Sequence, residues 1–274
     1  MKKNKIIIIP LVLLFTYLVI VTIGCIAQTS MMFHPKKLDS NYHYDNEYSN
    51  REEVFITTPD NEKINGLFFN AKNDNVILYF HGNSGSLDSW QYVYKNFQSL
   101  KYNFFIIDYR GYGKSSGSIS EKGLYTDGQA ALDYLRNKGF KKQNIIIYGR
   151  SIGTGIAVET AKNTDTLKAL ILETPFTSMI DLTNAKVPYL FPSIFLKYGF
   201  KNKDKINSIK SPLLVIHGTI DEVIPFKQGK ELFDKYNHQK EFLKIENGNH
   251  NNLSNFPDFI QGIMLFLYYI DTKK

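Results

Sequence analysis

Short runs of consecutive apolar residues recur along most of the 274-residue chain. Runs that are apolar at every position are typical of strands buried on both faces of a sheet. They lie at residues 76–80, 104–107, 145–147, 169–172 and 213–216, and a further strand is expected at 241–245. The segments between the runs are long enough for crossover helices. This alternation predicts an α/β fold with a doubly wound, mostly parallel sheet.

Apolar residues follow two other spacings in the rest of this region. Residues 52–69, EEVFITTPDNEKINGLFF, alternate between apolar and polar on both sides of a Pro-Asp-Asn turn, which predicts an antiparallel hairpin. Two segments repeat apolar residues at helical spacing, which predicts amphipathic helices between the strands and at the end of the chain. Their apolar positions are Leu124, Ala131 and Leu135, and Phe256, Phe259, Ile260, Ile263, Met264 and Leu267.

The amino terminus has a different pattern. Three lysines precede 18 uncharged, mostly apolar residues from Ile6 to Ile23, which as a helix would span roughly 27 Å, close to the thickness of a bilayer core. We expect a membrane helix within residues 1–25, with the lysines on the cytoplasmic side and the folded body on the other. Two alternatives are a cleaved secretory signal and lipidation of Cys25, because residues 22–25, TIGC, look like a bacterial lipoprotein signal.

The rest of the chain reads as a linker over residues 26–49 and one domain over residues 50–274. The hydrophobic fraction of 43% is sufficient for a large core, and the single cysteine excludes an intrachain disulfide. The net charge is +7, but residues 1–40 hold five Lys and one Asp, which leaves +3 for the other 234 residues. This weak charge argues against a nucleic-acid partner.

A serine stands between glycines just after one of the buried strands. Residues 148–155 read YGRSIGTG and contain the pattern GxSxG around Ser151. A sharp turn from strand to helix requires small residues beside the serine, because larger side chains would collide with the neighbouring backbone. The pattern therefore predicts a nucleophilic serine exposed at the edge of the sheet where ligands bind.

A serine hydroxyl needs a base and a carboxylate that orients the base. In open sheets with such a serine, the acid and the histidine follow it along the chain. Asp221 follows the strand at residues 213–216, and His250 follows the strand at 241–245 in the sequence ENGNHNN. We therefore expect Ser151, Asp221 and His250 to form a catalytic triad.

Each partner of the serine has a rival. Glu222 is next to Asp221 and could serve as the acid. His238 lies before the last strand and competes with His250, whereas His217 lies at a strand end and is expected to be a core residue. The remaining histidines precede the serine. We prefer Asp221 and His250 because each lies in a loop at the correct edge of the sheet.

Attack on a carbonyl also requires two fixed donors for the oxyanion. The backbone N–H of Ile152 lies at the start of the helix after the serine, and the loop YFHGNSG supplies that of Asn83. Asp108 and Arg110 also follow a strand, but they precede the serine. We interpret them as a structural loop network.

These motifs together resemble the α/β-hydrolase superfamily over roughly residues 50–270. The segments HGNSG, DYRGYGKSSG, YGRSIGTG, HGTIDEVIP and GNH carry the resemblance. Within the superfamily the chain is similar to small membrane-anchored hydrolases related to depalmitoylating enzymes and to the serine aminopeptidase-like group. The resemblance implies a serine hydrolase with Ser151 as nucleophile, Asp221 as acid, His250 as base, and Asn83 and Ile152 at the oxyanion hole.

A short cap insertion is expected at about residues 174–205, where aromatic residues would favour an apolar acyl group. The expected pocket residues are Phe176, Met179, Phe191 and Phe195. We therefore expect hydrolysis of esters or thioesters of a small-molecule or lipid-linked acyl substrate. An aminopeptidase or amidase, and a non-catalytic binding protein, are the alternatives. No metal or other cofactor is expected, because the chain has neither an HExxH motif nor a cysteine pair.

Overall fold

An eight-stranded sheet forms the centre of the computed structural model, which describes residues 2–45, 47–164 and 166–272. The strand order is β10-β9-β8-β7-β4-β6-β3-β2. The β2–β3 and β3–β6 pairs are antiparallel, and the other five pairs of neighbouring strands are parallel. The strands are β2 (Arg51–Thr57), β3 (Lys63–Phe69), β4 (Val76–Phe80), β6 (Asn103–Ile107), β7 (Ile145–Arg150), β8 (Ala169–Glu173), β9 (Leu213–Gly218) and β10 (Lys240–Ile245). The predicted parallel sheet and its amino-terminal hairpin are confirmed.

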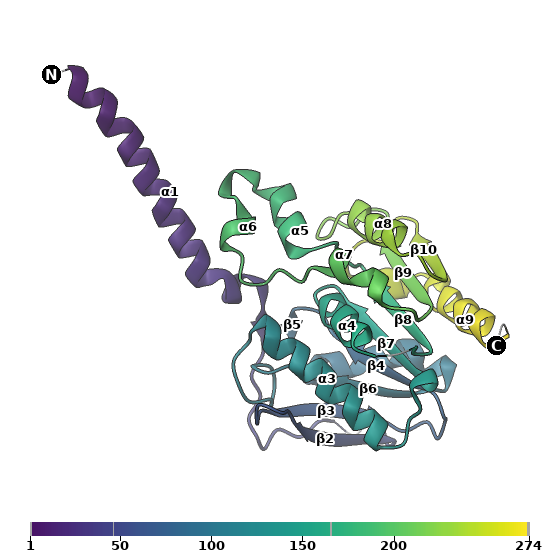
Figure 1. Cartoon of the computed structure of the whole chain (residues 1–274). Helices are drawn as coiled ribbons and strands as arrows, with labels where there is room; N and C mark the ends of the chain where they lie inside the picture. Colours follow the sequence, from purple (N-terminus) through teal and green to yellow (C-terminus); the bar gives the residue numbers. More distant parts are fainter. Residues whose placement is uncertain (1, 46, 165, 273–274) are drawn as a thin grey trace.

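Helices cover both faces of the sheet (Figure 1). Apolar side chains of α3 (Glu121–Asn137), α4 (Gly153–Lys162) and α8 (Phe226–Lys235) pack on one face. Those of α2 (Leu87–Trp90), η1 (Gln91–Leu100) and α9 (Pro257–Thr272) pack on the other. Shorter turns are η2 (Lys142–Asn144), α7 (Asn202–Lys205), η4 (Ile206–Ser208) and η5 (Leu253–Asn255). Because both faces are covered, β4, β6 and β8 are buried along their whole length.

The prediction for one residue on the apolar face of the last helix was wrong. Met264 is 43% exposed, because it lies on the side of α9 that faces away from the sheet. Phe259 and Ile263 lie on the same helix and are buried against the sheet, as expected.

The cap lies between β8 and β9 and consists of short helices. These are α5 (Met179–Lys186), η3 (Pro188–Leu190) and α6 (Pro192–Phe195). In Figure 1 they stand above the sheet, beside the inner end of the amino-terminal helix. The cap is therefore placed where it can contact both the edge of the sheet and that helix.

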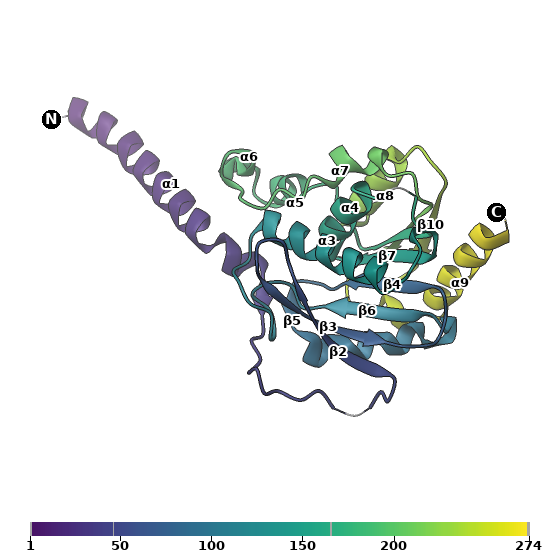
Figure 2. The same cartoon turned by 60° about the horizontal axis from the view of Figure 1, so that its bottom comes forward.

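The amino-terminal helix α1 (Lys2–Met32) projects from the body (Figure 2). Residues Ile8–Met32 are long and apolar enough to cross a membrane. The expected linker differs from the structure in its first part, because residues 26–32 continue the helix. The chain then forms β1 (His34–Pro35), which pairs in parallel with β5 (Ser84–Gly85).

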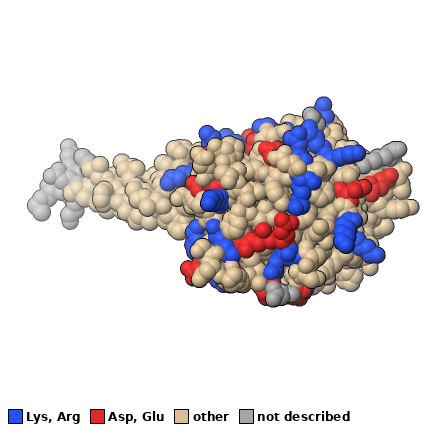
Figure 3. Space-filling model, turned by 90° about the horizontal axis from the view of Figure 1, so that it is seen from below, with Lys and Arg blue, Asp and Glu red and all other residues tan. Residues whose placement is uncertain are grey.

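The charge distribution separates α1 from the body. On the face shown in Figure 3, acidic and basic side chains are interspersed over the body. Residues 8–32 of α1 contain no charged residue. Charged side chains are therefore spread over the body, whereas this part of α1 is uncharged.

Candidate active site

Ser151 lies on a sharp turn between β7 and α4. Its φ of 53° is in the left-handed region, which few residues other than glycine adopt. A Cβ at Gly149 would lie 2.6 Å from the Cβ of Ala157, and a Cβ at Gly153 would lie 2.2 Å from the carbonyl oxygen of Phe80. The two glycines are thus required by close packing of strand, turn and helix, as the GxSxG pattern predicted.

His250 connects the serine to a carboxylate. Its Nε2 lies 3.0 Å from Ser151 Oγ, and its Nδ1 lies 2.8 Å from Asp221 Oδ2. Asp221 comes from the loop after β9, and His250 from the loop after β10. Because the carboxylate accepts the Nδ1 proton, Nε2 is left to accept the proton of the serine hydroxyl. The fold therefore brings the three predicted residues together in series.

Hydrogen bonds hold Asp221 in its ionised form. The backbone N–H groups of Val223 and Ile224 donate to Oδ1, at 2.9 and 2.8 Å. Burial alone would raise the pKa of the Asp221 carboxyl. The contacts from His217 and His250 and the two backbone donors outweigh burial and hold this pKa well below its usual range. The carboxylate thus stays charged and can stabilise an imidazolium.

The rival residues lie elsewhere. Glu222 and His238 are exposed to solvent. His217 is fully buried, with Nε2 2.9 Å from the carbonyl oxygen of Ile224 and 3.5 Å from Asp221 Oδ2. It therefore lies near the same carboxylate oxygen of Asp221 that His250 contacts, and it is a core residue as expected.

The two predicted oxyanion donors lie beside the serine. Asn83 and Ile152 line the same cavity as Ser151 and His250. Within the described part of the chain, the backbone N–H of neither residue makes a hydrogen bond. The carbonyl of Asn83 accepts bonds from His34 N and Tyr112 Oη, at 2.9 and 2.7 Å. These bonds fix the loop while its N–H stays available for a ligand.

The cavity beside Ser151 has a volume of about 470 Å³. Phe176 and Met179 line it, as expected, but Phe195 lines a neighbouring cavity against α1. The expectation for Phe191 was wrong, because this residue ends the η3 turn with φ of 47° and is 57% exposed. The presence of many aromatic residues in the cap did not indicate which of their rings are exposed to solvent.

Several residues that line the cavity were missed by the sequence reasoning, among them Arg150, Trp90 and Met32. Arg150 donates to the carbonyl oxygen of His250 at 3.3 Å and to Asn251 Oδ1 at 3.1 Å, so it holds the histidine loop against β7. Its guanidinium also lies 5.4 Å from the ring centre of Trp90. Met32, at the end of α1, forms part of the wall. Only the position of Arg150 next to the serine could have indicated a role.

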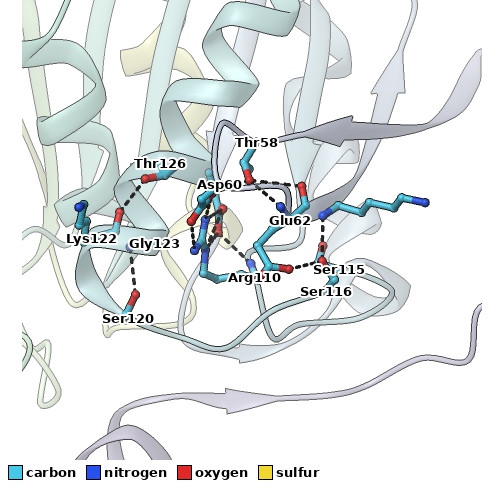
Figure 4. Close-up of polar contacts among 12 residues, drawn as sticks. Thr58, Asp60, Glu62, Arg110, Ser115, Ser116, Ser120, Lys122, Gly123 and Thr126 are labelled. Carbon is cyan, nitrogen blue, oxygen red and sulfur yellow. Dashed lines mark hydrogen bonds and ion pairs between the residues drawn. The ribbon is translucent and has the colours of Figure 1, made fainter.

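Arg110 belongs to a separate charged network (Figure 4). Its guanidinium donates to Asp60 Oδ2 and to Asp127 Oδ1, both at 2.8 Å. Asp60 lies in the turn between β2 and β3, and Asp127 lies on α3, so the network joins the hairpin, the loop after β6 and a helix. This agrees with its interpretation as a structural network.

Known proteins share sequence and fold with this chain. A family model described as alpha/beta hydrolase fold matches residues 75–199. The human alpha/beta hydrolase domain-containing protein 17B is 37% identical over 234 residues, which cover 81% of this chain and 78% of the human protein. Protein bem46 of Schizosaccharomyces pombe is 40% identical over 203 residues, which cover 70% of this chain and 67% of bem46.

Solved structures share the same architecture. An esterase of Pyrococcus furiosus superposes with a TM-score of 0.69 at 21% identity, over 87% of this chain and 97% of the esterase. An acetyl xylan esterase from Paenibacillus gives a TM-score of 0.65 at 19% identity, over 90% and 92% of the two chains. At these identities the superpositions establish the fold. Together with the closer relatives in sequence, they show that this chain belongs to the α/β-hydrolase superfamily.

Proposed function

We propose that this protein is a membrane-anchored serine hydrolase that cleaves ester or thioester bonds of an apolar acyl substrate. The observation that carries the proposal is the position of His250, which lies within hydrogen-bonding distance of both Ser151 and Asp221. An alcohol, an imidazole and a carboxylate in series are the arrangement that makes a serine nucleophilic at neutral pH. Membership of the α/β-hydrolase superfamily supports it further.

In the first half of the reaction, Ser151 Oγ attacks the acyl carbonyl carbon while His250 Nε2 takes the hydroxyl proton. The carbonyl oxygen becomes negatively charged and accepts hydrogen bonds from the N–H groups of Asn83 and Ile152. Asp221 stabilises the imidazolium without taking its proton. The C–O or C–S bond to the leaving group then breaks, and His250 protonates the departing alcohol or thiol.

In the second half, water replaces the leaving group. His250 removes a proton from the water, whose oxygen attacks the acyl-serine ester. The second tetrahedral intermediate collapses to release the carboxylic acid, and the proton returns to Ser151 Oγ. The enzyme ends in its starting state, so no further reactant is needed.

The lining of the cavity favours an acyl group as the bound part of the substrate. Phe176, Met179, Leu182 and Ile224 contribute apolar side chains near the serine. Apolar walls with a few convergent polar groups are typical of sites for apolar ligands. We prefer esters and thioesters to amides, and comparing kcat/KM for p-nitrophenyl esters, acyl-CoA thioesters and aminoacyl amides tests this choice. Faster turnover of the amides would overturn it.

We further propose that α1 is retained and holds the catalytic domain on the non-cytoplasmic side of a membrane. The lysines before the apolar segment support this orientation. Protease added to intact cells should then digest a tag fused after the carboxyl terminus. The intact mass of the purified protein separates this form from one that begins at a lipidated Cys25 or lacks the segment.

The central experiment labels the nucleophile. A fluorophosphonate probe should modify the wild-type protein, and Ser151→Ala should abolish the labelling, because only an activated hydroxyl attacks the probe. Ser84→Ala is the matched control, since Ser84 lines the same cavity, whereas the hydroxyl within hydrogen-bonding distance of His250 is that of Ser151. Equal labelling of Ser151→Ala and the wild type would refute the assignment.

A further inference from the structure

A second cavity lies between α1 and the cap, on the side of the active site that faces the membrane helix. Its volume is about 500 Å³. The α1 side is formed by residues that include Ile20, Val21 and Gly24, and the cap side includes Thr183 and Leu196. Most of these side chains are apolar. We call this cavity the α1 groove.

The α1 groove adjoins the cavity that contains Ser151. Met32, Met179 and Leu182 line both cavities. Methionine side chains are unbranched and rotate readily, so they adapt to the shape of a ligand. The wall between the two cavities therefore consists of side chains that can move aside for a chain passing from one cavity to the other.

Hydrogen bonds fix α1 to the cap along this groove. Gln28 is 8% exposed, and its Nε2 donates to the carbonyl oxygen of Phe195 at 2.9 Å. Its Oε1 accepts from the backbone N–H of Lys197 at 2.7 Å. Thr29 Oγ1 and Tyr198 Oη are 2.7 Å apart. The buried side-chain amide of Gln28 thus joins α1 to the cap. It holds the two walls of the α1 groove in fixed positions.

The outer end of the α1 groove lies within the apolar part of α1. Ile20, Val21 and Gly24 belong to the segment Ile8–Met32 that is long enough to span a membrane. An α-helix rises 1.5 Å per residue, so Ile20 to Met32 covers roughly 18 Å. A zigzag chain of C–C bonds of about 1.5 Å needs roughly 14 carbons for the same length. The groove thus matches one long unbranched acyl chain.

We propose that α1 forms one wall of an acyl channel, in which the carbonyl of the substrate lies at Ser151 and its unbranched tail lies in the α1 groove. The proposal rests on the proposed serine hydrolase function and adds a role for the membrane helix in selecting long chains. The tail can pass from the bilayer into the α1 groove without crossing water, which avoids the cost of hydrating its apolar surface.

Filling the groove from the α1 side tests the channel. A Cβ at Gly24 would meet no atom within 4 Å, so Gly24→Trp places its ring in the groove without displacing the backbone. The full chain in detergent micelles is assayed with p-nitrophenyl palmitate and p-nitrophenyl butyrate. Gly24→Trp should lower the palmitate to butyrate ratio of kcat/KM by about tenfold or more, because the long tail loses its place. Ile26→Trp, at a position that is 77% exposed, should keep the wild-type ratio.

Filling the groove from the cap side provides an independent test that leaves α1 unchanged. Thr183 lines the groove from α5, and Ala185 on the same helix is exposed. Thr183→Phe should lower the same ratio, whereas Ala185→Phe should not. This pair distinguishes blockage of the groove from any effect of a substitution on the way in which α1 enters a membrane.

The outcomes separate the channel from the proposed function. If both groove variants keep the wild-type ratio, or lose activity on the two esters equally, the channel is refuted while the hydrolase assignment stands. If the wild type hydrolyses neither ester and Ser151 takes no fluorophosphonate label, the proposed function fails and the channel fails with it.

Discussion

Two aspartates at the same edge of the sheet, Asp221 and Asp108, each pair with a histidine from another loop, but only one of these pairs is placed for chemistry. His250 Nδ1 lies 2.8 Å from Asp221 Oδ2, and the ring reaches Ser151 on its other side. His81 Nε2 lies 3.6 Å from Asp108 Oδ1, and both side chains are fully buried. The His250 side chain is 11% exposed. The two pairs contain the same residue types, but they differ in whether a ligand can reach the histidine.

The two carboxylates also differ in their electrostatics. Burial raises the pKa of Asp108, and its contact with His81 only partly offsets this effect. At Asp221, histidines and backbone donors outweigh burial and lower the pKa. Both Asp108 oxygens lie within 3.2 Å of the backbone N–H of Leu87, so this carboxylate supports a loop. The comparison teaches that the same residue pair can orient a base or hold a backbone, depending on its partners.

The largest expected effect comes from the same substitution made in both pairs. Asp221→Asn should lower kcat by about 10⁴-fold, because an amide favours the wrong tautomer of the imidazole. Asp108→Asn should change kcat by less than about tenfold, since Asp108 contacts His81 and the backbone of Leu87 and is not a member of the triad. Steady-state assays on p-nitrophenyl butyrate measure both. Similar losses in the two variants would remove the distinction between the pairs.

A smaller effect concerns stability at the structural carboxylates. Asp127→Ala should lower the free energy of unfolding by about 3 kcal/mol, because it leaves the buried Arg110 without its main partner. Asp60→Ala is the matched control on the same arginine. Its carboxylate is half exposed, so the loss should stay below about 1 kcal/mol. Urea unfolding in detergent measures both values, and kcat should be retained in both variants. If Asp60→Ala lost more stability than Asp127→Ala, Asp127 would not be the main partner of Arg110.

The smallest expected effect is a difference in pH dependence between the two carboxylates. The pKa of Asp221 is lowered in the folded state, so its ionisation stabilises the fold above about pH 4 and this gain is lost as the pH falls further. The pKa of Asp108 is raised, so its ionisation costs stability as the pH rises above about 4. As the pH rises from 3 to 7, the free energy of unfolding of Asp221→Asn should therefore fall relative to that of the wild type. The free energy of unfolding of Asp108→Asn should rise relative to it. The free energies of unfolding of both variants are measured with urea at each pH. If they change with pH in the same way, the two sites do not differ.

Much of the fold could be predicted from local patterns. Residues 76–80 form β4 as expected, because a strand covered on both faces must be apolar at every position. Residues 52–69 form the expected hairpin. Ser151 and its glycines were recognisable because the turn restricts the residues that fit. Asp221 and His250 were recognisable because they follow strands whose ends meet at one edge.

Contacts between distant segments could not be predicted in the same way. Phe191 and Phe195 are close in sequence and similar in chemistry, yet one is exposed and the other lines the α1 groove. Nothing in the pattern around Met32 indicated that it lies beside the active site. The aromatic residues of the cap have no repeat that fixes their direction, because its helices are only three to eight residues long.

The sequence by itself determined the order of strands and helices, the apolar helix before the domain, and the chemical groups that lie at the edge of the sheet. These features depend on neighbours in the chain, whose spacing is fixed by covalent geometry. The tertiary structure alone decided that His250 reaches both Ser151 and Asp221, and that Gln28 joins α1 to the cap. Such contacts depend on how separate elements pack, and packing is set by the shapes of many side chains together.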